Sequence, residues 1–482
     1  MNKNNAYFLA TLVCLTLTTP AHTQPSGTPI TIGEQLTIES TVLDEQRSVI
    51  VGLPDSYQLG DEHYPVLYVL DGSDHFHYTT GLTRFLATNE FIPEMIVIAV
   101  NNTDRTRDMT PPSEESGEQQ NYPNHGGAEN FQRFFAEDLM PWVEENYRTH
   151  PYNVLIGHSL GGLFAVHTLI SRPELFNAYI AISPSMWWDD QGLVDQAEEF
   201  FSSTAQLPVS LYMTVGNEGG PLLGGTRKLS GVLDAATPQD FLWQFDHMPL
   251  ETHGTVPHRS TYQGLEFVFA NWALRNPYDV YSQYGLEAVK QFHAFGDQRY
   301  GTRRGIPVTT QGSLLGNMIR DGDLASATTL LTQPAETDTT PSGFYSFLAD
   351  ALRASGDQEQ STHFYLLALQ KNPGNMMARA ALDESDVDYS TLIPQVQVAA
   401  NVLQSYEGMY SSTLAGVIKV SVEDGQLYRE LNSTRFKLHP LSDTEFYLQE
   451  DDVRYNFRIT DSGEISGIHI RLGNIQFIAE RQ

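Results

Sequence analysis

The chain has 482 residues, of which 40% are hydrophobic and 11% aromatic, a composition typical of globular domains and not of disordered chains. Its length exceeds what one ordinary core supports, so we expect several domains. The formal net charge of −31 argues against binding to nucleic acid or insertion into anionic membranes, because a strongly acidic surface is repelled by both.

Residues 1–23 have the features of a bacterial-type secretory signal peptide. Lys3 gives a positive start, an apolar stretch follows, and small residues precede a predicted cleavage site. The apolar stretch is too short for a permanent transmembrane helix of about 20 residues. Cys14 lies inside this segment after Val13, where a lipoprotein cleavage site needs a small residue. We therefore expect an exported protein, periplasmic or secreted, with neither lipid anchor nor disulfide.

Apolar runs alternate with amphipathic helical stretches across residues 24–275, which indicates a mainly parallel sheet flanked by helices. Residues 30–53 interleave polar and apolar side chains and are predicted to form an antiparallel hairpin at the sheet edge. Residues 130–147 have helical spacing and are predicted to form one core-facing helix. The other predicted strands are residues 66–70, 95–100, 154–156, 178–182, 209–215 and 241–245.

The run 157–162, Gly-His-Ser-Leu-Gly-Gly, carries the clearest chemical signal. A predicted strand enters it and a predicted helix leaves it, which is the context of the strained turn that bears a nucleophilic serine in α/β-hydrolases. Gly157 and Gly161, two residues before and after the serine, would let the backbone approach closely. The sequence therefore predicts an α/β-hydrolase fold with Ser159 as the nucleophile.

A serine nucleophile needs a base, and the base needs an orienting acid. In this fold both follow the serine along the chain, on loops after later strands. Glu218, in a glycine-rich loop after the predicted strand 209–215, is the predicted acid. Three other acids are alternatives: Asp189, Asp190 and Asp234.

His253, on the loop between the last predicted core strand and the last helix, is the predicted base, and His258 is its alternative. Two backbone N–H groups must stabilise the oxyanion that forms during acyl transfer. One is expected from Leu160, and the other from Gly72 or Ser73 after the predicted strand 66–70.

Residues 276–393 are predicted to be helical. Gly322 and Gly356 occupy equivalent turns 34 residues apart, which is the period of tetratricopeptide repeats. Because two copies are few for a solenoid, a degenerate repeat and a plain helical linker remain open. Residues 394–482 alternate apolar and polar side chains between hairpin turns and are predicted to form an antiparallel β domain. Its opening, residues 406–410, resembles that of a barrel-like domain appended to secreted bacterial hydrolases.

The first domain resembles the esterase family that includes esterase D and bacterial siderophore esterases. The matching segments are residues 69–72, 105–111, 126–128, 157–162, 183–188 and 251–254. The resemblance implies a serine carboxylesterase with Ser159, Glu218 and His253 as its triad, and places Arg107 and Trp187 near the pocket.

The side chains near that implied pocket have two interpretations each. Arg107 could bind an anionic group of the substrate or tie down its loop through an acid such as Asp108. Trp187 and Trp188 could wall a substrate pocket or pack in the core. No cofactor or metal site is predicted, because His75 and His77, spaced for one strand face, lack a third ligand.

The leading hypothesis is hydrolysis of a small-molecule carboxylic ester, with a siderophore, a carbohydrate ester or a small acyl ester as substrate. The same triad would serve an acyltransferase, so acyl transfer remains an alternative. A third hypothesis is a binding or scaffold protein whose hydrolase core is vestigial and whose residues 276–482 dock a protein partner.

Overall fold

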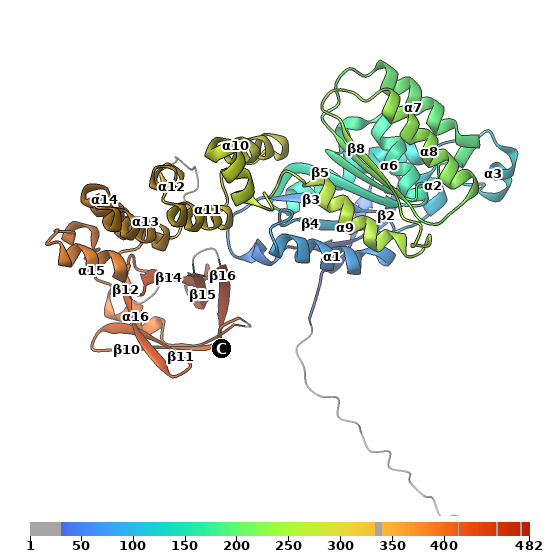
Figure 1. Cartoon of the computed structure of the whole chain (residues 1–482). Helices are drawn as coiled ribbons and strands as arrows, with labels where there is room; N and C mark the ends of the chain where they lie inside the picture. The colour runs from blue at the N-terminus through green and yellow to red at the C-terminus, as the bar shows by residue number, and fades with distance from the viewer. Residues whose placement is uncertain (1–29, 333–339, 413, 450–451, 473–474) are drawn as a thin grey trace, which may run out of the picture.

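The computed structural model describes residues 30–332, 340–412, 414–449, 452–472 and 475–482. The predicted signal peptide therefore lies outside the described residues. Along the chain, an eight-stranded sheet with helices on both faces is followed by a run of helices and then by a closed barrel (Figure 1). No helix among the described residues combines the length and the apolar character needed to cross a bilayer.

The sheet has the strand order β1-β2-β4-β3-β5-β6-β7-β8. Its strands are β1 (Glu34–Ser40), β2 (Glu45–Gly52), β3 (Tyr64–Val69), β4 (Ile96–Val100), β5 (Thr149–His158), β6 (Ala178–Ile182), β7 (Ser210–Val215) and β8 (Leu242–His247). The pair β1–β2 is antiparallel, β2 runs antiparallel to β4, and the remaining strands are parallel. The predicted edge hairpin and the α/β-hydrolase fold are confirmed.

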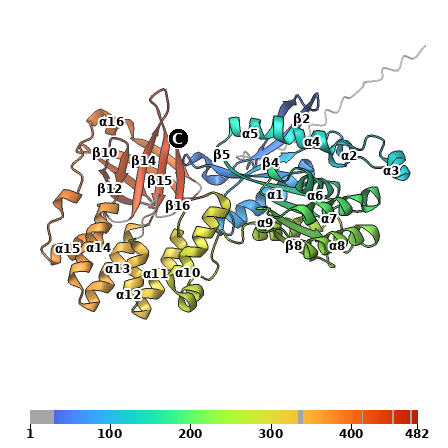
Figure 2. The same ribbon diagram turned by 90° about the horizontal axis from the view of Figure 1, so that it is seen from above.

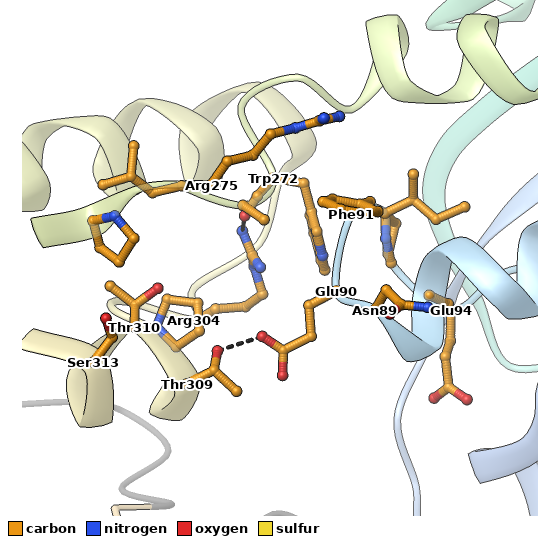
Figure 3. A pocket seen from close by; sticks show the side chains of 17 residues that line it. Asn89, Glu90, Phe91, Glu94, Trp272, Arg275, Arg304, Thr309, Thr310 and Ser313 are labelled. Carbon is orange, nitrogen blue, oxygen red and sulfur yellow. Dashed lines mark hydrogen bonds between the residues drawn. The ribbon is translucent and has the colours of Figure 1, made fainter. Parts of the chain in front are cut away.

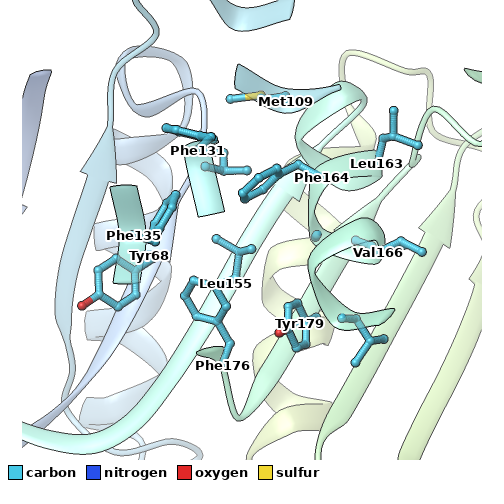
Figure 4. Packing of buried hydrophobic residues seen from close by; sticks show 14 of the residues in the cluster. Tyr68, Met109, Phe131, Phe135, Leu155, Leu163, Phe164, Val166, Phe176 and Tyr179 are labelled. Atoms are coloured by element: carbon cyan, nitrogen blue, oxygen red, sulfur yellow. The ribbon is translucent and has the colours of Figure 1, made fainter. Parts of the chain in front are cut away.

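Helices cover both faces of the sheet and close a separate core on each. They are α1 (Gly72–Thr88), α2 (Arg105–Met109), α3 (Ser116–Asn121), α4 (Ala128–Phe134), α5 (Met140–Asn146), α6 (Leu160–Ser171), α7 (Gly192–Ser203), α8 (Gly220–Ala235) and α9 (Val256–Val268). Helices α1 and α9 pack on one face. On the other face, aromatic side chains from α4 and α6 interlock over β3 and β5 (Figure 4).

The helix predicted over residues 130–147 is interrupted in the middle. Between α4 and α5 the backbone adopts a π-helical turn, Phe135–Leu139. Asp138 in this turn accepts hydrogen bonds from Ser40 Oγ at 2.6 Å and Thr41 Oγ1 at 2.7 Å. The widened turn thus ties the helix to the β1–β2 connection, a tertiary contact that helical periodicity does not reveal.

The predicted helical segment contains α10 (Pro277–Tyr300), α11 (Val308–Asp321), α12 (Leu324–Leu331), α13 (Ser342–Ser355), α14 (Gln358–Lys371) and α15 (Met376–Glu384). Gly322 and Gly356 both adopt left-handed conformations that end α11 and α13. Asp323 and Asp357 then cap α12 and α14 by accepting backbone N–H bonds. The two turns share one geometry, while the tetratricopeptide assignment stays a prediction.

After a short helix, α16 (Ala400–Ser405), the chain forms an antiparallel closed barrel of eight strands. They are β9 (Gly408–Ser412), β10 (Gly416–Glu423), β11 (Gln426–Leu431), β12 (Thr434–Pro440), β13 (Glu445–Tyr447), β14 (Val453–Ile459), β15 (Ile465–Leu472) and β16 (Ile475–Arg481). Tyr406 stacks on Phe457 in the barrel core with ring centroids 3.9 Å apart. The predicted antiparallel β domain is confirmed, and its described strands close into a barrel in which each strand pairs with two neighbours.

The helices and barrel attach at the amino ends of the parallel strands (Figures 1 and 2). His150, at the start of β5, hydrogen-bonds the Gly301 carbonyl at 2.9 Å. Arg299 donates to Ser210, the first residue of β7, at 2.6 Å. Tyr300 is buried in the core of the α1–α9 face. The carboxyl ends of the strands, where the predicted catalytic groups lie, therefore face away from the appended parts.

Candidate active site

Ser159 sits in a sharp turn between β5 and α6. Its backbone has φ 61° and ψ −115°, a conformation that costs a non-glycine residue free energy and persists only when its surroundings hold it. Two backbone hydrogen bonds do so: Ser159 donates to Ile182 at 2.9 Å, and Ser185 donates to the Ser159 carbonyl at 3.0 Å. The turn has the geometry predicted for a nucleophile.

Glycines allow the close backbone approaches in this turn. Of the two glycines singled out from the sequence, Gly157 is required for this reason and Gly161 is not. A Cβ on Gly157 would lie 2.0 Å from the Gly161 carbonyl oxygen, and one on Gly162 would lie 2.9 Å from Pro184 Cα. At Gly161 the nearest atom to an added Cβ is 3.4 Å away. The close approaches therefore require glycine at 157 and 162 more than at 161.

Glu218 and His253 are brought together from the loops after β7 and β8. The His253 Nδ1 and Glu218 Oε1 atoms are 2.7 Å apart. The Glu218 side chain is 13% exposed and that of His253 is 41% exposed. The His253 ring lies beside the ring of His158, with centroids 4.4 Å apart. Because His158 directly precedes Ser159, this contact brings the imidazole to the nucleophile turn.

The Ser159 hydroxyl makes its described hydrogen bond with another serine. Its Oγ lies 3.4 Å from Ser185 Oγ, and the described hydrogen bonds do not include one to His253. Catalytic hydrogen bonds are often long in proteins without substrate and tighten when it binds.

The alternative acids and base have other partners. Asp189 accepts from Ser113 Oγ at 3.1 Å and from the Glu114 amide at 2.8 Å. Asp234 is exposed on α8. His258 lies in α9 and its ring neighbours Tyr78 at 5.4 Å. Asp190 borders a surface hollow described below. The described contacts thus favour Glu218 and His253.

The predicted oxyanion donors lie at the starts of two helices. Leu160 begins α6, and Gly72 and Ser73 begin α1. The first amides of a helix have no acceptor one turn earlier, so they are free to face a developing negative charge. Asp71 precedes them in a left-handed conformation, φ 53°.

Arg105 fixes the loop that carries these α1 donors. Its guanidinium donates to both carboxylate oxygens of Asp71, at 2.6 and 3.0 Å, and to the His158 carbonyl at 3.1 Å. Burial alone would raise the pKa of Asp71, but the ion pair with Arg105 and a hydrogen bond from Asn102 outweigh it and hold that pKa below its usual value. Arg105 therefore links this loop to the nucleophile turn.

Comparison with known proteins agrees with this geometry. Residues 40–223 match the family described as "Putative esterase". We call residues 30–275, the part of the chain that contains this match, the esterase domain. Residues 394–482 match a separate domain of unknown function, DUF3471.

Two curated relatives of the esterase domain are named as siderophore esterases. The chain is 34% identical over 171 residues to ferri-bacillibactin esterase BesA of Bacillus subtilis, covering 32% of this chain and 59% of that protein. It is 37% identical over 159 residues to the siderophore enterobactin esterase of Emericella nidulans, covering 29% and 52%. The alignments thus span less than two thirds of each relative.

A solved structure extends the likeness further along the chain. The IroE-like serine hydrolase from Shewanella oneidensis is 28% identical, with a TM-score of 0.52, covering 62% of this chain and 97% of that one. This coverage includes more of the chain than the matched esterase segment.

Arg107 of the esterase domain is held by acids. It donates to Glu45 at 2.6 and 3.0 Å and to Asp108 at 2.7 Å. These partners, led by the hydrogen bond to Glu45, raise the pKa of Arg107 above its usual value. The contacts correspond to the loop-anchoring alternative, while a role in binding substrate stays a prediction.

The two tryptophans differ in their surroundings. Trp188 is buried and donates its indole N–H to the Pro111 carbonyl at 3.1 Å, so it packs in the core. Trp187 is partly buried and borders a hollow of about 440 Å³ together with Asp190 and Gly219. Gly219 follows Glu218, so this hollow adjoins the acid's loop and is a candidate substrate subsite.

Two residues of the site escape sequence reasoning. His158 occupies a position of the run 157–162 at which the motif specifies no residue type. Burial, with the neighbouring His253 and His75, lowers the pKa of His158 to about 3. Ser185 lies just after β6, 26 residues beyond Ser159, and only the folded chain brings the two hydroxyl groups into contact.

His75 and His77, expected on a strand face, lie instead on helix α1. Among the described residues no cluster of three or more His, Cys, Asp or Glu is arranged to hold a metal ion.

Proposed function

We propose that the chain is a serine carboxylic-ester hydrolase that acts through an acyl-enzyme on Ser159. The observation that carries this proposal is the 2.7 Å hydrogen bond between Glu218 and His253 beside the nucleophile turn. An acid that accepts the Nδ1 proton leaves the Nε2 lone pair of the imidazole free to act as the base.

In the proposed reaction the Ser159 hydroxyl attacks the ester carbonyl while His253 Nε2 takes its proton. The amides of Leu160 and of Gly72 or Ser73 would stabilise the oxyanion. His253 then returns the proton to the leaving alcohol as the C–O bond breaks. A water molecule, deprotonated by the same imidazole, attacks the acyl-enzyme and releases the acid. The 41% exposure of His253 gives water access, which favours hydrolysis over acyl transfer.

The curated relatives named as siderophore esterases make siderophore esters our first proposed substrates, ahead of carbohydrate and small acyl esters. Turnover compared across a catecholate siderophore lactone, a feruloyl ester and an acetyl ester would rank these classes.

We also propose that the protein is exported, because residues 1–23 have the features of a signal peptide.

The proposal is tested by Ser159→Ala. We expect hydrolysis of a short p-nitrophenyl ester to fall by a factor of about 10³ or more, because the nucleophile is lost. A fluorophosphonate probe should label the native chain and not the variant. Unchanged turnover in Ser159→Ala would rule out the acyl-enzyme route.

A further inference from the structure

A second cavity lies at the junction between the esterase domain and the helices that follow. It has a volume of about 480 Å³ and is formed by the α1–β4 connection, the segment after α9 and the start of α11 (Figure 3). The α1–β4 connection lies at the amino end of β4, whereas Ser159 follows the carboxyl end of β5. The two sites are therefore at opposite ends of the sheet.

Arg304 is the central charged group of this junction cavity. Its guanidinium carbon stacks over the Trp272 ring at 3.3 Å from the centroid, and one terminal nitrogen donates to the Trp272 carbonyl at 3.0 Å. Its Nε is buried and has no hydrogen-bond partner among the described residues. Asp297 is its ion-pair partner at 3.6 Å, which is too long for a hydrogen bond.

The acids near Arg304 are already engaged elsewhere. Asp297 accepts hydrogen bonds from Thr302 Oγ1 at 2.7 Å and from the Gly305 amide at 2.9 Å. Glu90 accepts from Thr309 across the junction (Figure 3). Burial, only partly offset by these acids, lowers the pKa of Arg304 to about 10. A guanidinium whose side chain is only 24% exposed and whose charge is incompletely compensated favours an additional anion.

The rest of the cavity wall is partly polar, with Glu94 accepting a hydrogen bond from Ser56, and partly apolar. Phe91, Trp272 and Pro307 line it, and Arg275 stacks over Phe91 at 4.5 Å while pairing with Glu266. A concave site with an apolar patch beside an undercompensated cation fits a ligand that combines one negative group with an apolar body.

We infer that this junction cavity binds a small organic carboxylate with an apolar or aromatic body. The carboxylate pairs with Arg304, and the body lies against Phe91 and Pro307. Because the walls come from both the esterase domain and α11, the bound carboxylate holds these parts together. This inference does not depend on the proposed hydrolase activity.

Benzoate, titrated into the full chain and followed by calorimetry, tests this inference. We expect saturable binding that Arg304→Gln weakens at least about tenfold, because a charge-assisted pair is lost. Arg133→Gln is the matched control. This exposed arginine of α4 pairs with Glu137 of the π-helical turn, away from the cavity, and its removal should leave benzoate affinity unchanged.

A second variant guards against misfolding of Arg304→Gln. Ser313 is exposed and borders the cavity, so Ser313→Trp fills the space while keeping Arg304. We expect it to abolish benzoate binding without lowering the melting temperature. The inference is overturned if both variants bind benzoate as tightly as the native chain does, a result expected if benzoate binds at Ser159 instead. The inference is also overturned if the native chain shows no binding at about 10 mM benzoate, because its dissociation constant would then be weaker than millimolar.

Discussion

At the scale of single residues, the proposed triad combines an acid that is nearly buried, Glu218, with a base that is more exposed, His253. Glu218 is held at the foot of the β7 loop, where a Cβ on Gly216 would lie 2.6 Å from its Oε2. Its second carboxylate oxygen has no hydrogen-bond partner among the described residues. The carboxylate is thus positioned to serve His253.

This positioning can be tested by changing the acid alone. We expect Glu218→Ala to lower kcat for a short p-nitrophenyl ester by about 10²- to 10⁴-fold, because the imidazole loses its orienting partner. Asp234→Asn, which removes an exposed alternative acid on α8, should leave kcat unchanged. A larger loss in the Asp234 variant than in the Glu218 variant would overturn the assignment of the acid.

Buried histidines make the fold sensitive to acid. Burial lowers the pKa of His167 from 6.5 to about 4. Below pH 6.5 the unfolded chain takes up a proton that the folded chain refuses, so stability is lost as pH falls from 6.5 toward 4, by up to about 1.4 kcal/mol per pH unit. We expect His167→Leu to show a smaller drop in melting temperature between pH 7 and pH 5 than the native chain. An equal drop would exclude His167 as a source of the acid sensitivity.

The contact between Glu218 and His253 could be predicted because the fold fixes the order of these residues along the chain and the loops that carry them. Of the partners of Arg107, Asp108 was predicted, but Glu45 was not, because it lies 62 positions earlier and no local pattern connects the two. His158 was missed for a related reason: its contact with His253 joins the last residue of β5 to the loop after β8.

At the scale of secondary structure, the turns after α11 and α13 each combine a left-handed glycine with an aspartate cap. Glycine adopts this conformation without the cost that a Cβ imposes. Because both turns use the same residue types in the same order, the 34-residue spacing between them could be recognised in the sequence.

Gly322, which ends α11, and Gly316, which lies inside this helix, provide a matched pair for testing the turn. Gly322→Ala should destabilise the helices by about 1 kcal/mol, because alanine resists the φ of 78° found there. Gly316 lies within the same helix with open space around its Cβ position, so Gly316→Ala should stabilise by about 0.5–1 kcal/mol. Urea unfolding of both variants measures these changes. The same sign of change in both would contradict this explanation.

The strands of the esterase domain were predictable because buried parallel strands are short, continuous apolar runs. The π-helical turn at Phe135–Leu139 was not, because its cause is a contact with the β1–β2 connection. A C-terminal barrel was suggested only by the resemblance of residues 406–410 to a barrel-like domain. Its closure requires β9 to pair with both β10 and β16, and alternation within single strands does not specify such long-range pairing.

At the scale of the whole molecule, α10 joins the appended parts to the esterase core. Tyr300 donates to the Val268 carbonyl at 3.0 Å and accepts from the Asn271 amide at 3.2 Å. Its ring lies 5.3 Å from those of Tyr152 and Phe269. The sequence placed a domain boundary at residue 275 and could not indicate this packing, because the partners of Tyr300 are distant along the chain.

This joint predicts that the esterase domain depends on α10 for stability. Tyr300→Ala should destabilise it by about 3–5 kcal/mol through the cavity left in its aromatic cluster, so ester hydrolysis should be lost at a lower temperature. Phe295→Ala changes a half-exposed aromatic residue of the same helix and should have little effect. Thermal inactivation of both variants distinguishes them, and equal inactivation temperatures would show that α10 is not required.

The attachment of the barrel at the amino ends of the strands has a practical consequence for access. A chain immobilised through residues 394–482 would present its catalytic entrance outward, away from the support. We therefore expect immobilisation through this domain to leave ester turnover close to that of the free chain.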